Sequence, residues 1–184
     1  MGKSTAAAML RRLGLPVFDS DGAVRALTAK NGAAIPAIAK RFPGTVHKGT
    51  LDRQALAKKV FSSSRQLTVL EAILHPLVKS RRSKFLSRMT RQRKKLVIFD
   101  IPLLFETGAE RGCDAVIVIS APATIQRQRV LRRPGMTTAR LSSILSRQMP
   151  DAQKRRRADV VVPSGIGKAE TLRRLKKALI VLGQ

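Results

Sequence analysis

The first residues of the chain have the types and spacing of a phosphate-binding turn. Gly2, Lys3, Ser4 and Thr5 match the end of the pattern G-x-x-x-x-G-K-[ST], which holds phosphates where it joins a strand to a helix. Backbone N–H groups would bind phosphate oxygens, Lys3 would contact the β- and γ-phosphates, and the Ser4 hydroxyl would bind Mg²⁺. Four residues are a weak signal, and an ordinary helix start capped by serine is the alternative.

Two carboxylates, Asp19 and Asp21, follow a short apolar segment at residues 16–18. Ligands of open α/β sheets bind at the carboxyl ends of strands. Acids at that place could orient an attacking hydroxyl, accept its proton, or hold a hydrated Mg²⁺. In the alternative reading Asp21 only caps the helix that is expected after it.

A further acid, Asp100, ends the continuous apolar run at residues 96–99. A buried parallel strand that ends in a carboxylate is typical of proteins in which that carboxylate supports Mg²⁺ beside bound ATP. The alternative is a core strand that ends in a capped turn.

Arginines are concentrated in one expected helix, at Arg127, Arg129, Arg132 and Arg133, with a turn at 134–135 after them. The forked guanidinium neutralises charge that is spread over several phosphate oxygens, so such a helix could form a lid over phosphates. A solvated basic face is the alternative.

The elements that must position these residues follow from the apolar periodicity. Short apolar runs predict strands at residues 16–18, 96–99, 115–119 and 160–162. Helical spacing and capping residues predict helices over residues 3–13, 22–30, 34–42, about 50–61, 67–89, 122–133, 137–148 and 168–182. Strands that alternate with helices indicate an α/β fold with a parallel sheet.

The composition is strongly basic, with 37 Lys and Arg against 11 Asp and Glu and a net charge of +26 over 184 residues. Such a charge attracts polyanions, nucleic acid first. The absence of Trp and Tyr leaves little to stack on bases, so solvated helix faces are the favoured explanation for most of these charges. A single cysteine, Cys113, fits a reducing cytoplasm, and no apolar stretch is long enough to predict a membrane span.

Taken in order, these motifs resemble the dephospho-CoA kinases along nearly the whole chain. His75-Pro76 and the Pro-Leu-Leu-Phe-Glu sequence at residues 102–106 are the most specific of them. The matching segments are Gly2 to Thr5, Asp19 to Asp21, Leu51 to Arg53 with Leu56, Val60 and Phe61, His75-Pro76, Asp100 to Glu106, Arg129 to Thr137, and Lys154 to Val162.

The resemblance implies an α/β fold of the P-loop NTPase type, a three-layer parallel sheet flanked by helices, with a helical CoA-domain insertion and an Arg-rich lid. All 184 residues would form one kinase domain. Its core would be residues 1–21, 92–121 and 159–184, its helical substrate domain about 22–91, and its lid about 122–158.

The resemblance also implies a reaction, the phosphorylation of the ribose 3′-hydroxyl of dephospho-CoA by ATP with Mg²⁺, which gives CoA and ADP. Asp21 would be the general base, and Lys3 and Arg129 would neutralise charge on the transferred group. ATP would bind at Gly2, Lys3, Ser4, Thr5, Arg133 and Gly165, Mg²⁺ at Ser4 and Asp19, and the acceptor at Asp19, His75, Pro102, Leu103, Leu104 and Glu106. In the alternative reading His75 with Pro76 only shapes a helix turn.

The chain departs from the family pattern in two places. The family begins with an apolar strand and Gly-x-x-Gly-x before Gly-Lys-Ser, whereas this sequence starts one residue before Gly2. We therefore expect Met1 to be an internal methionine, and weak folding and very low activity from the 184 residues alone. Pro163-Ser164-Gly165 stands where the family often has Asn-Gly near the adenine, which leaves the adenine contacts open.

Two other functions remain open from the sequence. One is a P-loop kinase for a nucleoside, nucleotide or shikimate-like acceptor, which would not require His75-Pro76 or the segment 102–106. The other is a basic nucleic-acid-binding protein built on a decayed kinase fold, which the charge favours and the ordered motifs oppose. We expect ATP and dephospho-CoA as small-molecule partners, a cytoplasmic location, and neither a membrane nor a specific nucleic acid as a partner.

Overall fold

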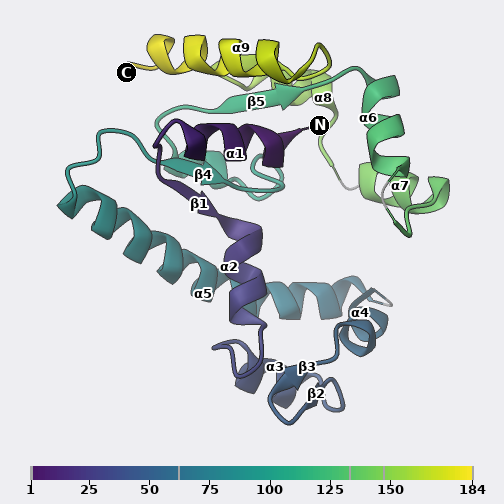
Figure 1. Ribbon diagram of the computed structural model, residues 1–184. Helices are drawn as coiled ribbons and strands as arrows, with labels where there is room; N and C mark the ends of the chain where they lie inside the picture. Colours follow the sequence, from purple (N-terminus) through teal and green to yellow (C-terminus); the bar gives the residue numbers. More distant parts are fainter. Residues whose placement is uncertain (1, 62, 133, 147, 184) are drawn as a thin grey trace. The chain divides into compact units, whose positions relative to one another are not determined.

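The computed structural model describes residues 2–61, 63–132, 134–146 and 148–183. The chain forms two compact units. The terminal unit contains Met1–Val17 and Asp100–Gln184, and the central unit contains Phe18–Phe99. Figure 1 shows the elements of both.

The terminal unit is built on a pair of parallel strands. Strand β5 (Ile117–Ser120) pairs with β6 (Val160–Pro163), in the register that places Ile117 opposite Val160. Its helices are α1 (Lys3–Arg12), the short 3₁₀ helix η1 (Ala109–Gly112), α6 (Ala123–Leu131), α7 (Thr138–Leu145), α8 (Asp151–Arg156) and α9 (Lys168–Val181).

Helix α9 covers this strand pair, because its apolar residues recur on one face. Leu175 is fully buried, and Val162 of β6 is 1 % exposed. Helix α9, drawn in yellow in Figure 1, contacts both β6 and α1. A second apolar cluster of Phe105, Val116 and Val118 lies at the start of β5. The start of α1 is thereby fixed beside the carboxyl ends of the two strands, where Ser164 follows β6.

The central unit is mainly helical. Its elements are α2 (Ser20–Leu27), α3 (Ile35–Arg41), the antiparallel strands β2 (Val46–His47) and β3 (Thr50–Leu51), α4 (Arg53–Phe61) and α5 (Ser64–Arg91). Strands β1 (Val17–Asp19) and β4 (Ile98–Asp100) form a two-stranded sheet at its boundary.

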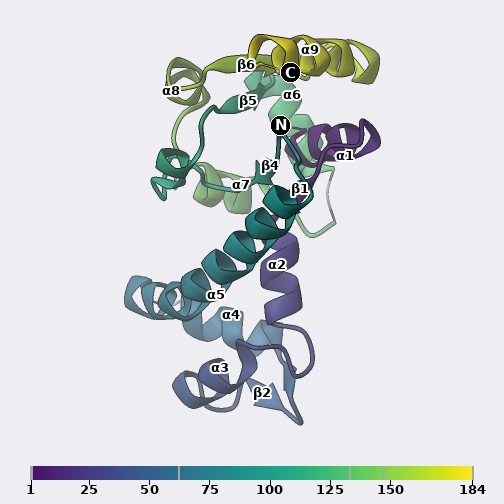
Figure 2. The same cartoon turned by 90° about the vertical axis from the view of Figure 1, so that its left-hand side faces the viewer.

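Helix α5 is the scaffold of the central unit. Helices α2, α3 and α4 contact it, and Figures 1 and 2 show α2 and α4 beside it from two directions. The core of this unit is a cluster of buried side chains from α2, α3 and α4 and the segments between them, against which apolar side chains of α5 pack. Its members are Leu27, Ala34, Ile38, Phe42, Leu56 and Val60.

The expected α/β fold is confirmed, and the four predicted strands and eight predicted helices appear within a few residues of their expected bounds. Three elements were not predicted, namely the β2–β3 hairpin, α8 and η1. Thr50 does not cap α4, because it lies in β3, whereas the Asp52 carboxylate accepts N–H bonds from Gln54 and Ala55 at 2.9 and 3.0 Å. Among the described residues no helix is both long and apolar enough to cross a bilayer.

Candidate functional site

The start of α1 has the backbone geometry of an anion site. Gly2 precedes the helix with φ 94° and ψ 8°, a left-handed conformation that glycine adopts without strain. The N–H of Ala6 donates to the carbonyl of Gly2 at 2.9 Å, so the N–H groups of Lys3, Ser4 and Thr5 precede the first helical bond. Ser4 and Thr5 are exposed. These N–H groups and hydroxyls, together with the helix dipole, favour a bound anion.

The structure brings together Lys3, the predicted phosphate contact, and Asp100, the carboxylate predicted to support Mg²⁺, from distant parts of the sequence. The Lys3 ammonium donates to Asp100 Oδ1 in an ion pair. The Asp100 side chain is 8 % exposed, and the Lys3 side chain is 41 % exposed. A buried carboxylate requires a partner, and the lysine supplies one without losing its access to solvent.

Arg129 of α6 is held close to the same helix start. Its Nη2 donates to the backbone carbonyl of Ser164 at 2.8 Å, and its Nη1 contacts the Ser164 hydroxyl at 3.4 Å. A Cβ atom on Gly2 would lie 3.2 Å from that same hydroxyl, so Ser164 adjoins Gly2 as well as Arg129. Ser164 in turn donates to the carbonyl of Ser120 at the end of β5, with N···O 2.7 Å.

Three other arginines and Gly165 were also predicted as site residues. Arg127 is exposed on α6, and Arg132 is exposed just after its end, whereas Arg133 lies outside the described residues. A Cβ atom on Gly165 would lie 3.1 Å from side-chain atoms of both Ile125 and Pro122, so a larger residue here would require these neighbours to shift. No described contact assigns Gly165 to a nucleotide, and its ATP-binding role stays a prediction.

The segment 101–106 carries both strain and a buried carboxylate. Leu103 is 41 % exposed and has φ 53°, a conformation that is costly for a bulky residue and is found at functional sites more often than elsewhere. Pro102 and Leu104 beside it are half-buried. Glu106 Oε1 accepts from Lys154 Nζ and from the N–H of Met149, both at 2.8 Å.

The environment of Glu106 keeps its carboxylate ionised. Burial favours the protonated form, but the hydrogen bond and the charge of Lys154 and the backbone N–H donors outweigh it, and the pKa of Glu106 is lowered. Within the described residues the second oxygen, Oε2, is buried without a hydrogen-bond partner. A ligand group with a donor could satisfy it.

Asp19 and Asp21 have different positions at the start of α2. Asp19 is the N-cap of α2, since its Oδ1 accepts the N–H of Gly22 at 2.8 Å, and its Oδ2 accepts from Arg25 at 3.0 Å. The alternative that Asp21 is the cap is therefore wrong. Asp21 lies in the first turn of α2 and is exposed. Because the cap of α2 does not use Asp21, the Asp21 carboxylate can interact with a ligand.

His75 and Pro76 both lie exposed inside α5. Pro76 lacks an N–H, yet α5 continues through it to Arg91. The pair therefore marks a helix interior that is open to solvent, and the acceptor role of His75 stays a prediction.

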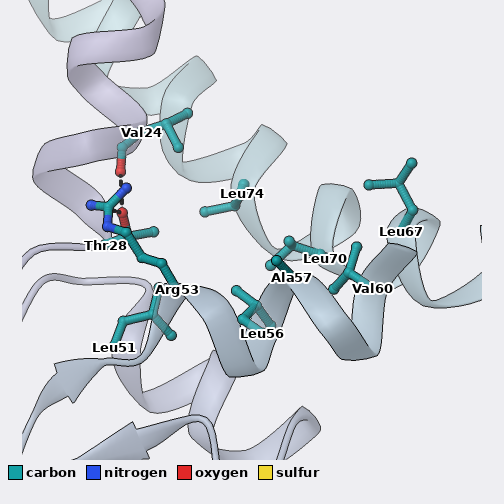
Figure 3. A pocket seen from close by; sticks show the side chains of 10 residues that line it. All are labelled: Val24, Thr28, Leu51, Arg53, Leu56, Ala57, Val60, Leu67, Leu70 and Leu74. Carbon is teal, nitrogen blue, oxygen red and sulfur yellow. Dashed lines mark hydrogen bonds between the residues drawn. The ribbon is translucent and has the colours of Figure 1, made fainter. Parts of the chain in front are cut away.

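An open apolar pocket of about 240 Å³ lies within the central unit, between α2, α4 and α5 (Figure 3). Two polar side chains stand at one end of it. Arg53 Nη2 donates to the Thr28 hydroxyl at 3.4 Å, and that hydroxyl donates to the carbonyl of Val24 at 2.9 Å. The other lining residues are Leu51, Leu56, Ala57, Val60, Leu67, Leu70 and Leu74.

Sequence reasoning missed three of these contributors. Arg53 and Lys154 were recognised as parts of the family pattern but were given no role, and Ser164 was noted only as a departure from it. The available signal for Arg53 was its position, because it is a basic residue that directly follows a turn motif. No signal links Ser164 to Arg129, because 35 residues separate them. In the described part of the chain, no group of three His, Cys, Asp or Glu residues is arranged to hold a metal.

Comparison with known proteins identifies the family. The family model described as Dephospho-CoA kinase matches residues 1–168. The dephospho-CoA kinase of Paramagnetospirillum magneticum is 57 % identical over 155 residues, which are 84 % of this chain and 73 % of the relative. That of Rhodospirillum rubrum is 52 % identical over 181 residues, 97 % of this chain and 85 % of the relative.

Two solved structures share the fold of this chain. The crystal structure of a protein from Thermus thermophilus superposes with a TM-score of 0.87 at 38 % identity, covering 100 % of this chain and 92 % of that one. The dephospho-CoA kinase of Campylobacter jejuni, at 23 % identity and a TM-score of 0.71, covers 98 % and 91 % and has the same fold. The chain therefore belongs to the dephospho-CoA kinase family.

Proposed function

We propose that this protein transfers the γ-phosphoryl group of ATP to the ribose 3′-hydroxyl of dephospho-CoA, giving CoA and ADP. The observation that carries the proposal is the start of α1. There Gly2 is left-handed, Lys3 is paired with Asp100, and Arg129 is anchored through Ser164 beside Gly2. Family membership supplies the acceptor, and it places dephospho-CoA ahead of nucleosides, nucleotides and shikimate-like acids.

The triphosphate would bind at the start of α1. The N–H groups of residues 3–5 and the positive end of the helix dipole would hold its oxygens. The Lys3 side chain is 41 % exposed, so its ammonium could donate to the β- and γ-phosphates as well as to Asp100. An ammonium has three donors, so it can contact a phosphate and keep the carboxylate.

Charge that develops on the transferred group would be neutralised by Lys3 and Arg129. The two hydrogen bonds to Ser164 limit the rotamers that Arg129 can adopt, so less entropy is lost when the guanidinium meets a phosphate. We assign the lid to residues 122–158 and the acceptor domain to residues 22–91. The lid would also exclude water and so suppress ATP hydrolysis.

Oxygen ligands for Mg²⁺ are available at the proposed positions. The hydroxyl of Ser4 is exposed at the start of α1, and hydroxyl and carboxylate oxygens are the ligands that Mg²⁺ prefers. Asp19 has suitable chemistry, but it already serves the cap of α2 and Arg25, so a bound ion would compete with Arg25. When bound, Mg²⁺ supplies neutralisation of charge on the β- and γ-phosphate oxygens.

Asp21 would accept the proton of the acceptor hydroxyl. It is an exposed carboxylate in the first turn of α2. A base of this kind orients the hydroxyl for in-line attack as well as removing its proton.

The proposed acceptor contacts follow from the family resemblance. His75 belongs to the central unit, and Pro102, Leu103, Leu104 and Glu106 belong to the terminal unit. The apolar pocket with Arg53 at one end suits a long, mostly apolar chain with polar amide groups, which describes the pantetheine arm of dephospho-CoA. We propose that the arm binds there.

A coupled assay of ADP release with ATP, Mg²⁺ and each candidate acceptor tests the proposal. We expect ADP release that depends on dephospho-CoA and is absent with adenosine or shikimate. The assay is run on the 184 residues and on a version extended at its N-terminus by an apolar strand and Gly-x-x-Gly-x, because the need for that segment remains a prediction. If both forms fold and neither responds to dephospho-CoA, the proposal is wrong. A cytoplasmic location likewise remains a proposal.

A further inference from the structure

The positive charge is not evenly distributed over the central unit. Residues 18–99 contain 18 Lys and Arg and only 4 Asp and Glu, and 9 of the basic residues fall within residues 79–95. No acid occurs between Glu71 and Asp100. The proposed kinase reaction uses none of these nine residues.

Four of the nine form one line on α5. Arg81, Lys84, Arg88 and Arg91 recur at intervals of three, four and three residues, which places them on one face of a helix. All four are exposed. At 1.5 Å per residue the line is about 15 Å long. We call these four residues the basic line of α5, and α5 is labelled in Figures 1 and 2.

The inward face of the same helix explains why the line faces solvent. Met89 is 5 % exposed, and the Phe85 ring packs against Phe18 and Phe99 with centroid distances of 5.5 and 6.5 Å. These apolar contacts fix the rotation of α5 within its unit. The four side chains of the basic line are exposed next to this face, and the Arg88 guanidinium lies over the Phe85 ring, 5.8 Å from its centroid.

The structure gives the basic line no counter-charge in its described part. Among the residues that the structure describes, none of the ion pairs involves Arg81, Lys84, Arg88 or Arg91. The turn that follows α5 adds the exposed cations Arg93, Lys94 and Lys95. Four like charges on one helix face repel each other, and a counter-charge from a partner would relieve that repulsion.

We infer that the basic line of α5 binds the phosphate backbone of double-stranded nucleic acid without regard to sequence. A row of exposed cations along one helix matches a row of phosphates. The aromatic rings of this region cannot stack on bases, since Phe18, Phe85 and Phe99 pack on one another and Arg82 and Arg88 lie over two of them. Proteins bind single strands largely by stacking bases on aromatic side chains, and the basic line offers no aromatic ring for such stacking.

Two other partners fit less well. A protein interface has an apolar or aromatic centre, whereas the four side chains of the line are all cationic. A membrane-surface helix places bulky apolar residues in the bilayer, but the apolar face of α5 is already packed inside its unit. An anionic membrane therefore becomes an outcome of the test.

The test measures binding of the full chain to two fluorescent 24-base-pair DNA duplexes of unrelated sequence, over a range of KCl concentrations. We expect equal affinity for both, and an affinity that falls steeply with salt. The variant Arg81→Gln/Lys84→Gln/Arg88→Gln/Arg91→Gln should lower the slope of log K against log[KCl] by about 3 to 4, because each phosphate contact contributes about 0.9. Glutamine keeps the helix propensity of the originals.

A matched control separates the line from net charge alone. Lys30→Gln/Lys40→Gln/Arg41→Gln/Lys58→Gln removes four exposed cations from elsewhere in the central unit, and it should change the slope by less than about 1. Equal losses in the two variants would overturn the inference. So would duplex binding that is absent, or replaced by line-dependent binding to phosphatidylserine vesicles. If the fourfold variant unfolds, Arg81→Gln/Lys84→Gln should show about half the change in slope.

Discussion

Lys3 and Asp100 form an ion pair across 97 residues of sequence, and they join the first turn of α1 to the end of β4. The pair combines two roles that sequence motifs treat separately. It satisfies a nearly buried carboxylate, and it orders the lysine that we propose to contact the phosphates of ATP. A lysine that is already ordered loses less conformational entropy on binding its ligand.

Removing the Lys3 charge should therefore damage both folding and catalysis. Lys3→Met leaves Asp100 buried without its partner, which should cost about 1–3 kcal/mol of unfolding free energy in urea. Adding Asp100→Asn should restore much of that stability, since an amide is cheaper to bury than a charge. Turnover should stay low in the double variant. Restored turnover would show that the lysine serves only the fold.

Substitution of Asp21 should lower kcat, whereas substitution of Asp19 should lower the stability of α2. Asp21→Asn should lower kcat by a factor of about 10² to 10⁴, the usual contribution of a general base, and leave thermal stability unchanged. Asp19→Ala should destabilise α2 by about 1 kcal/mol, because it removes the N-cap. Kinetics and thermal melts on both variants check this. A loss of stability in Asp21→Asn with normal kcat would contradict the assigned roles.

Arg129 should matter more than its neighbours on α6. Arg129→Gln should lower kcat by about 10² to 10³, the cost of losing one charge-stabilising donor in a transition state. Arg127→Gln, on the same helix and also exposed, serves as the control and should be near normal. Ser164→Ala should have a small effect, because the shorter bond of Arg129 is to the backbone carbonyl of Ser164. Equal effects at positions 127 and 129 would indicate a general charge effect.

Filling the apolar pocket should raise KM for the acceptor and leave KM for ATP unchanged. Ala57→Leu adds bulk where α4 lines the pocket and should raise KM for dephospho-CoA by about 10-fold or more, with KM for ATP unchanged. Gln54→Leu, exposed on α4 and outside the lining, is the control. An unchanged KM for dephospho-CoA in Ala57→Leu would remove the pocket from the acceptor site.

Glu106 should make stability depend on pH on the acid side. Its pKa in the folded protein is lowered from the ordinary 4.5, with the Lys154 hydrogen bond and backbone donors outweighing the opposing effect of burial. The stabilisation is present above pH 4.5 and is lost as the pH falls through the lowered value. Urea unfolding at pH 7 and near pH 3 should show a larger loss in the parent than in Glu106→Gln. Identical losses would assign the acid sensitivity to other carboxylates.

The sequence predicted the α/β fold because each strand is a continuous apolar run between clear helical patterns. It failed where elements are very short. The β2–β3 hairpin has two residues per strand, too few for an alternating pattern, and its Lys48-Gly49 turn has positive φ at both positions.

Contacts across the sequence were the other limit. The cap of α2 was ambiguous between Asp19 and Asp21, because β1 ends one residue later than its apolar run. The Lys154 bond to Glu106 and the Arg129 bond to Ser164 depend on how loops return to the sheet, and no local pattern encodes them. The start of α1 was predictable because its residues are adjacent.

Phosphorus NMR of the product most directly tests the proposed reaction. The extended protein and the 184-residue chain are incubated with ATP, Mg²⁺ and dephospho-CoA, and the new phosphate is assigned on the ribose. We expect a single new phosphomonoester at the 3′-oxygen, formed in step with ADP. ADP without a ribose phosphomonoester, or a phosphate on another hydroxyl, would contradict it.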